Sequence, residues 1–288
     1  MTKLSVRHST TYHYRYPVAL SPHRLILRPR EGQDLLLASH EIQATPSAGL
    51  TWATDVFGNA IATATFAEAT DRLEIISLAE VDLRSAAWPV FDISFSAATY
   101  PFQYDGEELK DLGALRNVQY PDPSGEFLAW VGAFVMSGST DTLSLLKDLS
   151  AGVSNGIAYR TREEEGTQSP LETLGLRSGT CRDFAVLFAE AARVLRFGAR
   201  IVSGYLYNPG QILIGSHDSG STHAWTDVYL PGAGWITFDP TNRSMGGANL
   251  IPVAVVRNIA QSAPISGGFI GPADAFNSMT VSVEIALL

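Results

Sequence analysis

The chain has 288 residues, of which 45% are hydrophobic and 17% charged, so it has enough apolar material for one large folded domain or two ordinary ones. Its net charge is -9, from 29 acidic and 20 basic residues that form no concentrated block of either sign. This composition predicts a soluble globular protein and argues against a nucleic-acid partner, whose binding surface normally clusters lysine and arginine.

No segment predicts secretion or a membrane partner. The N-terminus lacks an apolar stretch as long as a signal peptide needs, and polar residues interrupt every later apolar run before it could span a bilayer. We therefore expect a cytoplasmic protein. The chain has one cysteine, Cys181, which excludes an intrachain disulfide and any metal site built from several cysteines.

The first part of the chain predicts β-strands. Side chains alternate between two faces from residue 4 to residue 16. Further strands are predicted at 24–29, 35–43, 50–55, 60–67 and 72–83, separated by turn signals such as Pro46-Ser-Ala-Gly49 and Phe57-Gly-Asn59. We expect an antiparallel β-sandwich-like N-terminal domain over residues 1–95, with its boundary between Ser85 and Pro101.

Beyond residue 101 the apolar spacing becomes helical. Helices are predicted at 124–136, 140–154 and 169–176, and a longer amphipathic helix runs from Cys181 to Phe197 before Gly198 ends it. Strands are predicted at 200–207, 222–230 and 235–240. We assign a second domain to residues 96–262 and a C-terminal segment to 263–288, whose last strand can join either domain.

Cys181 falls where the long helix begins. The unpaired N–H groups and the dipole of a helix N-terminus stabilise a thiolate, which is the nucleophilic form of cysteine. The preceding residues, Ser178-Gly-Thr180, form a turn that can bring the Cys181 N–H close to an oxyanion. An isolated cysteine is also consistent with a small buried hydrophobe, so its role depends on other residues.

Two predicted strands can bring a histidine and an aspartate together in a hairpin. Alternation puts His223 on the same face as Tyr229, and Trp235 on the same face as Asp239. If Leu230 pairs with Trp235, the histidine and the aspartate point to opposite faces. If Tyr229 pairs with Trp235, they are diagonal neighbours on one face, roughly 7 to 8 Å apart. A catalytic pair requires the second register.

In that register the three residue types fit a thiol enzyme. His223 would take the proton of Cys181 and later protonate a leaving group, while Asp239 would accept from the other ring nitrogen and fix the tautomer. From spacing alone, a histidine between polar residues is more often a surface side chain, and an aspartate before proline is more often a turn former.

Five sequence blocks in this order carry a family resemblance. They are Gly179-Thr-Cys-Arg-Asp-Phe-Ala185, Val202-Ser-Gly-Tyr-Leu206, His223-Ala-Trp225, Gly234-Trp235 and Phe238-Asp-Pro-Thr-Asn242. The set resembles the bacterial branch of the transglutaminase-like superfamily, which is related in fold to papain-like thiol proteases. The N-terminal run from His8 to Tyr14, with Leu27-Arg-Pro29 after it, resembles the β-rich region that accompanies this domain.

The resemblance implies an α+β fold in which the helix bearing the cysteine packs on an antiparallel sheet. It makes Cys181 the nucleophile, His223 the general base and Asp239 the orienting acid. Asp183 matches a family position, and we expect it to tie down backbone at the helix start, because a second acid near the nucleophile would oppose thiolate formation. The family often supplies a second oxyanion donor from an upstream aromatic side chain, for which Tyr159 is the candidate.

The stretch from 208 to 220 is longer than a tight turn, and we expect it to form a lip over the site. We do not expect a metal site of His217, Asp218 and His223 in this region. Zinc usually takes at least three well-placed ligands in a tetrahedral site, so Cys181 would have to be one of them. The chain also lacks Walker-type, dinucleotide-binding and EF-hand motifs, and we expect neither a metal nor a cofactor.

The leading hypothesis is a thiol-dependent amide hydrolase, a cysteine protease or amidase that acts on a peptide or protein through an acyl-enzyme at Cys181. Resolution of the same intermediate by an amine would give a transglutaminase, and the acceptor site decides between these outcomes. A non-catalytic binding or scaffold module is the third possibility, and the complete set of cysteine, histidine and aspartate argues against it.

Overall fold

The structure is a computed structural model that describes residues 2–136, 138–162, 166–215 and 220–288. Its N-terminal strands form two antiparallel sheets, with β6 between β1 and β3, and β5 between β2 and β4. The sheets pack face to face around Leu25, Leu73 and Ile75. The strands are β1 (Thr2–Leu20), β2 (His23–Leu25), β3 (Leu35–Thr45), β4 (Ala48–Thr54), β5 (Ala60–Phe66) and β6 (Ala69–Leu83). The predicted β-rich N-terminal region is confirmed.

A mostly helical stretch follows. Its elements are η1 (Phe95–Ala97), β7 (Thr99–Tyr100), α1 (Gly106–Leu112), η2 (Gly113–Arg116), α2 (Glu126–Gly132), β8 (Thr140–Asp141), α3 (Thr142–Gly156), β9 (Ala158–Tyr159), α4 (Pro170–Leu176), β10 (Ser178–Gly179) and α5 (Cys181–Val194). Helix α1 is an addition to the predicted elements. Asp105 caps it by accepting from the backbone N–H groups of Glu107 and Glu108, a capping box that the sequence also shows.

The remaining strands build a central antiparallel sheet in the order β14-β13-β12-β11-β15 and complete the N-terminal sheets. The strands are β11 (Gly198–Tyr207), β12 (Gly220–Leu230), β13 (Gly234–Asp239), β14 (Ser244–Met245), β15 (Leu250–Val256), β16 (Ile265–Ser266), β17 (Phe269–Ile270) and β18 (Phe276–Leu287), and the short helix η3 (Ile259–Ser262) lies between β15 and β16. Strand β15 was not predicted from the sequence, although its apolar run is typical of a strand buried on both faces.

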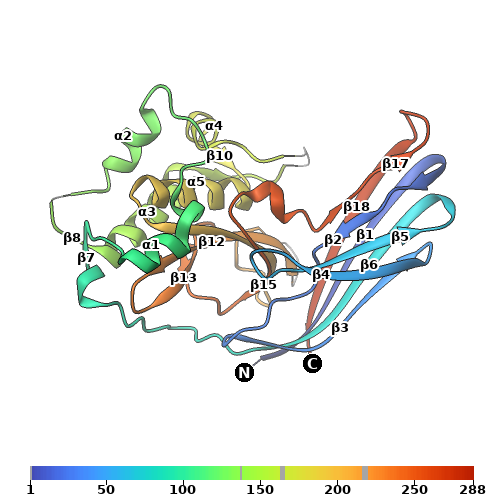
Figure 1. Cartoon of the computed structure of the whole chain (residues 1–288), viewed down its shortest axis with the longest axis horizontal. Helices are drawn as coiled ribbons and strands as arrows, with labels where there is room; N and C mark the ends of the chain where they lie inside the picture. The colour runs from blue at the N-terminus through green and yellow to red at the C-terminus, as the bar shows by residue number, and fades with distance from the viewer. Residues whose placement is uncertain (1, 137, 163–165, 216–219) are drawn as a thin grey trace.

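The central sheet is covered on both faces, which explains why most of β12 is buried. Helix α5 lies on one face and packs Phe184 and Phe188 against Val228 and Phe238. The N-terminal sheet lies against the other face (Figure 1). This arrangement is the α+β fold expected from the sequence, with the cysteine-bearing helix on an antiparallel sheet.

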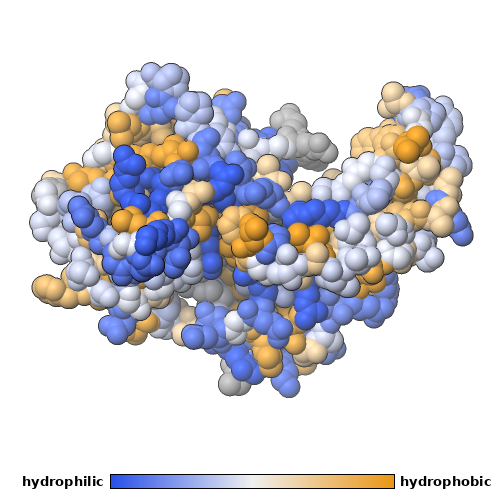
Figure 2. Space-filling view, viewed as in Figure 1, coloured by the Kyte–Doolittle hydropathy of each residue, from blue (hydrophilic) through white to orange (hydrophobic). Residues whose placement is uncertain are grey.

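The last strand returns to the first. Strand β18 pairs with β1, with Ile285 opposite Val6, so the C-terminal strand belongs to the N-terminal sheet and the two ends of the chain lie near each other (Figure 1). The division of the chain at residues 95 and 262 stays a prediction. Strands β17 and β18 carry exposed apolar side chains, among them Ile270 and Phe276. The end of the molecule where β17 lies in Figure 1 carries orange patches among paler ones in Figure 2. Within the described residues, no helix is long and apolar enough to cross a membrane.

Candidate active site

A buried carboxylate holds the start of α5. Asp183 is fully buried, and one of its oxygens accepts from the backbone N–H of Thr180 at 2.7 Å and from its hydroxyl at 3.0 Å. The other oxygen accepts from Arg162 at 3.2 Å and from the N–H of Gln168 at 2.7 Å. A Cβ atom at Gly179 would lie 2.8 Å from the Cβ of Asp183, so this tight turn needs glycine. The carboxylate thus ties down backbone before the helix, as expected.

Strands β12 and β13 pair in the register that a catalytic pair requires. Tyr229 lies opposite Trp235, so His223 and Asp239 lie on the same face. Nε2 of His223 is 2.8 Å from Oδ2 of Asp239. The hydroxyl of Thr226 donates to a carbonyl of α5 at 2.8 Å, which fixes the histidine-bearing strand against the cysteine-bearing helix.

Asp239 is buried and surrounded by hydrogen-bond donors. Its Oδ2 accepts from His223 and, at 2.8 Å, from Nδ2 of Asn242, while its Oδ1 accepts from the backbone N–H groups of Thr241 at 3.0 Å and Asn242 at 3.3 Å. Burial alone would raise the pKa of Asp239, but the charge of His223 and these hydrogen bonds lower it. The surroundings therefore favour the ionised carboxylate.

The ring of His223 is buried among the Asp239 carboxylate, the Cys181 thiol and the ring of Trp225. Burial opposes its charge, but the carboxylate of Asp239 and the thiol of Cys181 outweigh burial and raise the pKa of His223 to about 10. Its Nδ1 is buried and makes no hydrogen bond to any described residue. The ring of Trp225 stacks on it, with centroids 6.1 Å apart. The ring therefore holds two protons at neutral pH, one of them bound by Asp239.

Tyr159 lies beside the cysteine because β9 pairs in parallel with β10, which places it opposite Gly179. Burial, and then the charges of Cys181 and Asp239, raise the pKa of Tyr159 to about 12. Its hydroxyl is therefore protonated at neutral pH and can donate a hydrogen bond. Tyr159 thus lies near Cys181, and its role as a second oxyanion donor stays a prediction.

The loop after β11 reaches this group of residues. A Cβ atom at Gly215 would lie 3.2 Å from Oη of Tyr159 and 3.8 Å from Nδ1 of His223, and the φ of +98° at this position also favours glycine. The described part of the predicted lip, residues 208–215, therefore borders the site. His217 and Asp218 of the metal alternative lie outside the described residues. The residues that the structure describes contain no group of three or more His, Cys, Asp or Glu side chains that could hold a metal ion.

Comparison with known families agrees with this geometry. The family model of the bacterial transglutaminase-like N-terminal region matches residues 4–82, and that of the transglutaminase-like superfamily matches residues 131–240. The chain belongs to the transglutaminase-like superfamily. The second match contains Cys181, His223 and Asp239, and the first spans residues 4–82 of strands β1 to β6.

Relatives of this transglutaminase-like chain cover most or all of its length. An uncharacterized protein of Mycobacterium leprae is 24% identical over 291 residues, covering 100% of both chains. An uncharacterized protein of Mycobacterium tuberculosis is 27% identical, covering 91% of this chain and 86% of that protein. A crystal structure described as a "putative cysteine protease" from Cytophaga hutchinsonii superposes with a TM-score of 0.74 at 21% identity, covering 100% of this chain and 91% of that one. It shows the same fold.

The structure brings the three predicted site residues together and adds one. Asn242 was part of the matching sequence block, but no role was predicted for it. It follows Asp239 by three residues, at a spacing where an aspartate side chain commonly accepts from nearby backbone N–H groups. That spacing predicts the backbone contact. The hydrogen bond from the Asn242 side chain depends on the turn, which the spacing alone does not define.

Proposed function

We propose that this protein is a thiol-dependent amide hydrolase that acts on a peptide or protein through an acyl-enzyme at Cys181. The main support is the buried pair of His223 and Asp239, 2.8 Å apart, whose imidazole has the Cys181 thiol as its other ionisable neighbour. A structural module would gain little from burying an ion pair next to a thiol, since buried ion pairs contribute little net stability.

In the proposed acylation step, His223 is protonated and Cys181 is the thiolate. The sulfur attacks the carbonyl carbon of the amide, and the carbonyl electrons move onto oxygen, which accepts from the N–H of Cys181 and the hydroxyl of Tyr159. The C–N bond then breaks, and His223 gives its proton to the departing amine. Asp239 holds the ring by its Nε2 throughout.

Deacylation reverses these roles. Water gives a proton to the now neutral His223 and attacks the thioester carbon. The C–S bond breaks, the carboxylic acid leaves, and the pair of thiolate and imidazolium is restored. An amine in place of water would give a new amide and transfer activity, so the acyl acceptor defines the reaction class.

The test is cleavage of casein by the purified protein, with and without a fluorescent alkyl amine. We expect new N-termini in both conditions, and no activity for Cys181→Ala or His223→Ala. The matched control is Asp227→Asn, because Asp227 is a buried carboxylate on β12 that pairs with Arg200 at 3.0 Å instead of with the histidine. Incorporation of the amine without cleavage would replace hydrolysis by transfer. Activity that survives Cys181→Ala would refute the proposed nucleophile.

A further inference from the structure

Asn242 connects the candidate site to the loop that borders it. Its Nδ2 donates to Oδ2 of Asp239 at 2.8 Å, and its Oδ1 accepts from the backbone N–H of Ile214 at 2.7 Å. These partners define the orientation of the amide, because a carboxylate can only accept and a backbone N–H can only donate. An aspartate at this position would face another carboxylate, and an aliphatic residue would make neither hydrogen bond.

The loop that contains Ile214 is held in shape by hydrogen bonds of Asn208, which lies just before it in the chain. Oδ1 of Asn208 accepts from the backbone N–H groups of Ile212 and Leu213, both at 3.1 Å, and Nδ2 of Asn208 donates to the carbonyl of Leu213 at 3.2 Å. The backbone N–H of Ile214 then donates a hydrogen bond to Asn242. The next residue, Gly215, lies against Tyr159 and His223. A shift of Ile214 would therefore move the backbone that borders both side chains.

We propose that Asn242 is a positioning residue that couples the position of the 208–215 loop over the site to the alignment of Asp239. The proposal rests on the proposed function, since it assigns Asn242 to the same reaction. One amide serves both contacts, so the loop and the carboxylate constrain each other. Such coupling is reciprocal: a change at Asp239 must loosen the loop, and a change at the loop must loosen Asp239.

Two variants of Asn242 separate the two contacts, and a third variant is the control. Asn242→Ala removes both hydrogen bonds. Asn242→Asp keeps an acceptor for the N–H of Ile214 but replaces the donor to Asp239 by a carboxylate. The matched control is Asn117→Ala, an exposed asparagine whose backbone carbonyl accepts from Gln119 and whose side chain lies outside the candidate site.

Two readouts that need no substrate follow the coupling. The first is hydrogen exchange of the Ile214 amide, which reports the loop contact. We expect about tenfold faster exchange in Asn242→Ala, the loss of one hydrogen bond. Asn242→Asp keeps an acceptor for the Ile214 N–H but loses the contact to Asp239, so coupling predicts severalfold faster exchange there, and the Asn117 control should exchange at the wild-type rate. Reciprocity predicts severalfold faster exchange in Asp239→Ala, although that change leaves Asn242 itself in place.

The second readout is the rate at which iodoacetamide alkylates Cys181 as a function of pH. The side chain of Asn242 is one of the donors that lower the pKa of Asp239, so both Asn242 variants should move the acid limb of this profile to higher pH. The Asp variant should move it further, because two carboxylates then face each other. The Asn117 control should show the wild-type profile.

Wild-type exchange at Ile214 in Asn242→Ala would overturn the proposal, as would unchanged exchange at Ile214 in Asp239→Ala. An unshifted alkylation profile in both Asn242 variants would also overturn it. If Asn242→Ala does not fold, Asn242→Asp decides the question: faster exchange at Ile214 together with a shifted profile supports the coupling, and wild-type exchange overturns it. Neither readout depends on turnover, so a failure to cleave casein would refute the proposed hydrolase and leave the coupling to be judged separately.

Discussion

His223 determines the protonation of the site because its two ring nitrogens have different neighbours. Nε2 bonds to Asp239, while Nδ1 makes no hydrogen bond to a described residue. Burial would keep the ring neutral, and the carboxylate keeps it charged, with a pKa of about 10. In the proposed resting state this charge lies beside Cys181 and stabilises the thiolate.

Asp239→Asn should therefore lower the pKa of His223. The substitution removes the carboxylate charge and leaves both the burial that lowers the pKa of the ring and the Cys181 thiol that raises it, so we expect this pKa to fall well below 10. An NMR titration of the histidine ring measures this directly. Asp227→Asn, the same change at a buried carboxylate that pairs with Arg200, should leave the titration of His223 unchanged. A ring that still titrates near pH 10 in Asp239→Asn would contradict the assignment.

At this scale the sequence predicted residue types and order better than it predicted contacts. Cys181, His223 and Asp239 could be named because they stand in an ordered set of blocks. The strand register remained open between two choices, and the structure resolves it with Tyr229 opposite Trp235. The bond from Asn242 to Ile214 spans 28 residues and depends on how the loop closes, so no local pattern predicts it.

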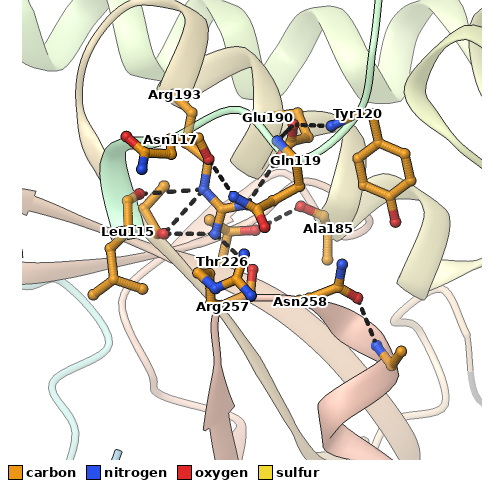
Figure 3. Close-up of polar contacts among 12 residues, drawn as sticks. Leu115, Asn117, Gln119, Tyr120, Ala185, Glu190, Arg193, Thr226, Arg257 and Asn258 are labelled. Carbon is orange, nitrogen blue, oxygen red and sulfur yellow. Dashed lines mark hydrogen bonds and ion pairs between the residues drawn. The ribbon is translucent and has the colours of Figure 1, made fainter. Parts of the chain in front are cut away.

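Helix α5 begins at Cys181 and carries a buried ion pair near its other end. Figure 3 shows this pair, Glu190 and Arg193, with the segments around it. Glu190 and Arg193 have side chains that are each 1% exposed. Glu190 accepts from the backbone N–H groups of Gln119 at 2.7 Å and Tyr120 at 3.3 Å. Arg193 donates to the backbone carbonyls of three residues, which are Leu115, Ala199 and Arg257. The pair thus fixes separate chain segments to the helix that presents the cysteine.

Glu190→Ala should be strongly destabilising. It leaves the Arg193 charge buried without a partner, which costs about 3 to 5 kcal/mol of unfolding free energy. Urea denaturation measures the loss. The matched control is Glu107→Ala in the exposed pair of Glu107 and Lys110, which has the same helical spacing and side chains 80% and 72% exposed. We expect the control to cost less than about 1 kcal/mol. Equal costs for the two variants would contradict the structural role of the buried pair.

Helical periodicity predicted α5 well but not its surroundings. The sequence gives a helix beginning at Cys181, and the structure ends it at Val194, three residues before the predicted end. Its polar residues Glu190 and Arg193 are as buried as the apolar face, because backbone groups from distant segments satisfy them. An amphipathic pattern identifies the apolar face of a helix, but it cannot show that other segments also cover the polar one.

The N-terminal sheet and the central sheet form one packed unit around His8. This histidine is 2% exposed, with Nδ1 3.0 Å from the hydroxyl of Tyr205 on β11 and Nε2 3.1 Å from the hydroxyl of Thr10. Strand β11 pairs with β12, where Gly204 lies opposite His223. A change in the packing of the N-terminal sheet would therefore act on the neighbour of the histidine-bearing strand.

Burial lowers the pKa of His8 from 6.5 to about 4. The unfolded chain binds this proton below pH 6.5 and the folded protein does not, so stability should fall as the pH drops from 6.5 to 4. The part due to His8 is on the order of 3 kcal/mol. In His8→Phe we expect a smaller fall over this range in thermal or urea unfolding. Stabilities at pH 8, where His8 is neutral in both states, provide the baseline. The same acid sensitivity in the variant as in the wild type would contradict the assignment to His8.

Alkylation of Cys181 by iodoacetamide at pH 6 tests the proposed site most directly. An ordinary cysteine is only about 0.3% thiolate at this pH, whereas a thiol beside a charged imidazole reacts as the thiolate. We predict that the wild-type protein reacts at least about tenfold faster than both His223→Ala and free cysteine. Mass spectrometry of the folded protein over time gives the rates. A wild-type rate no faster than that of His223→Ala would contradict a histidine-activated nucleophile at Cys181.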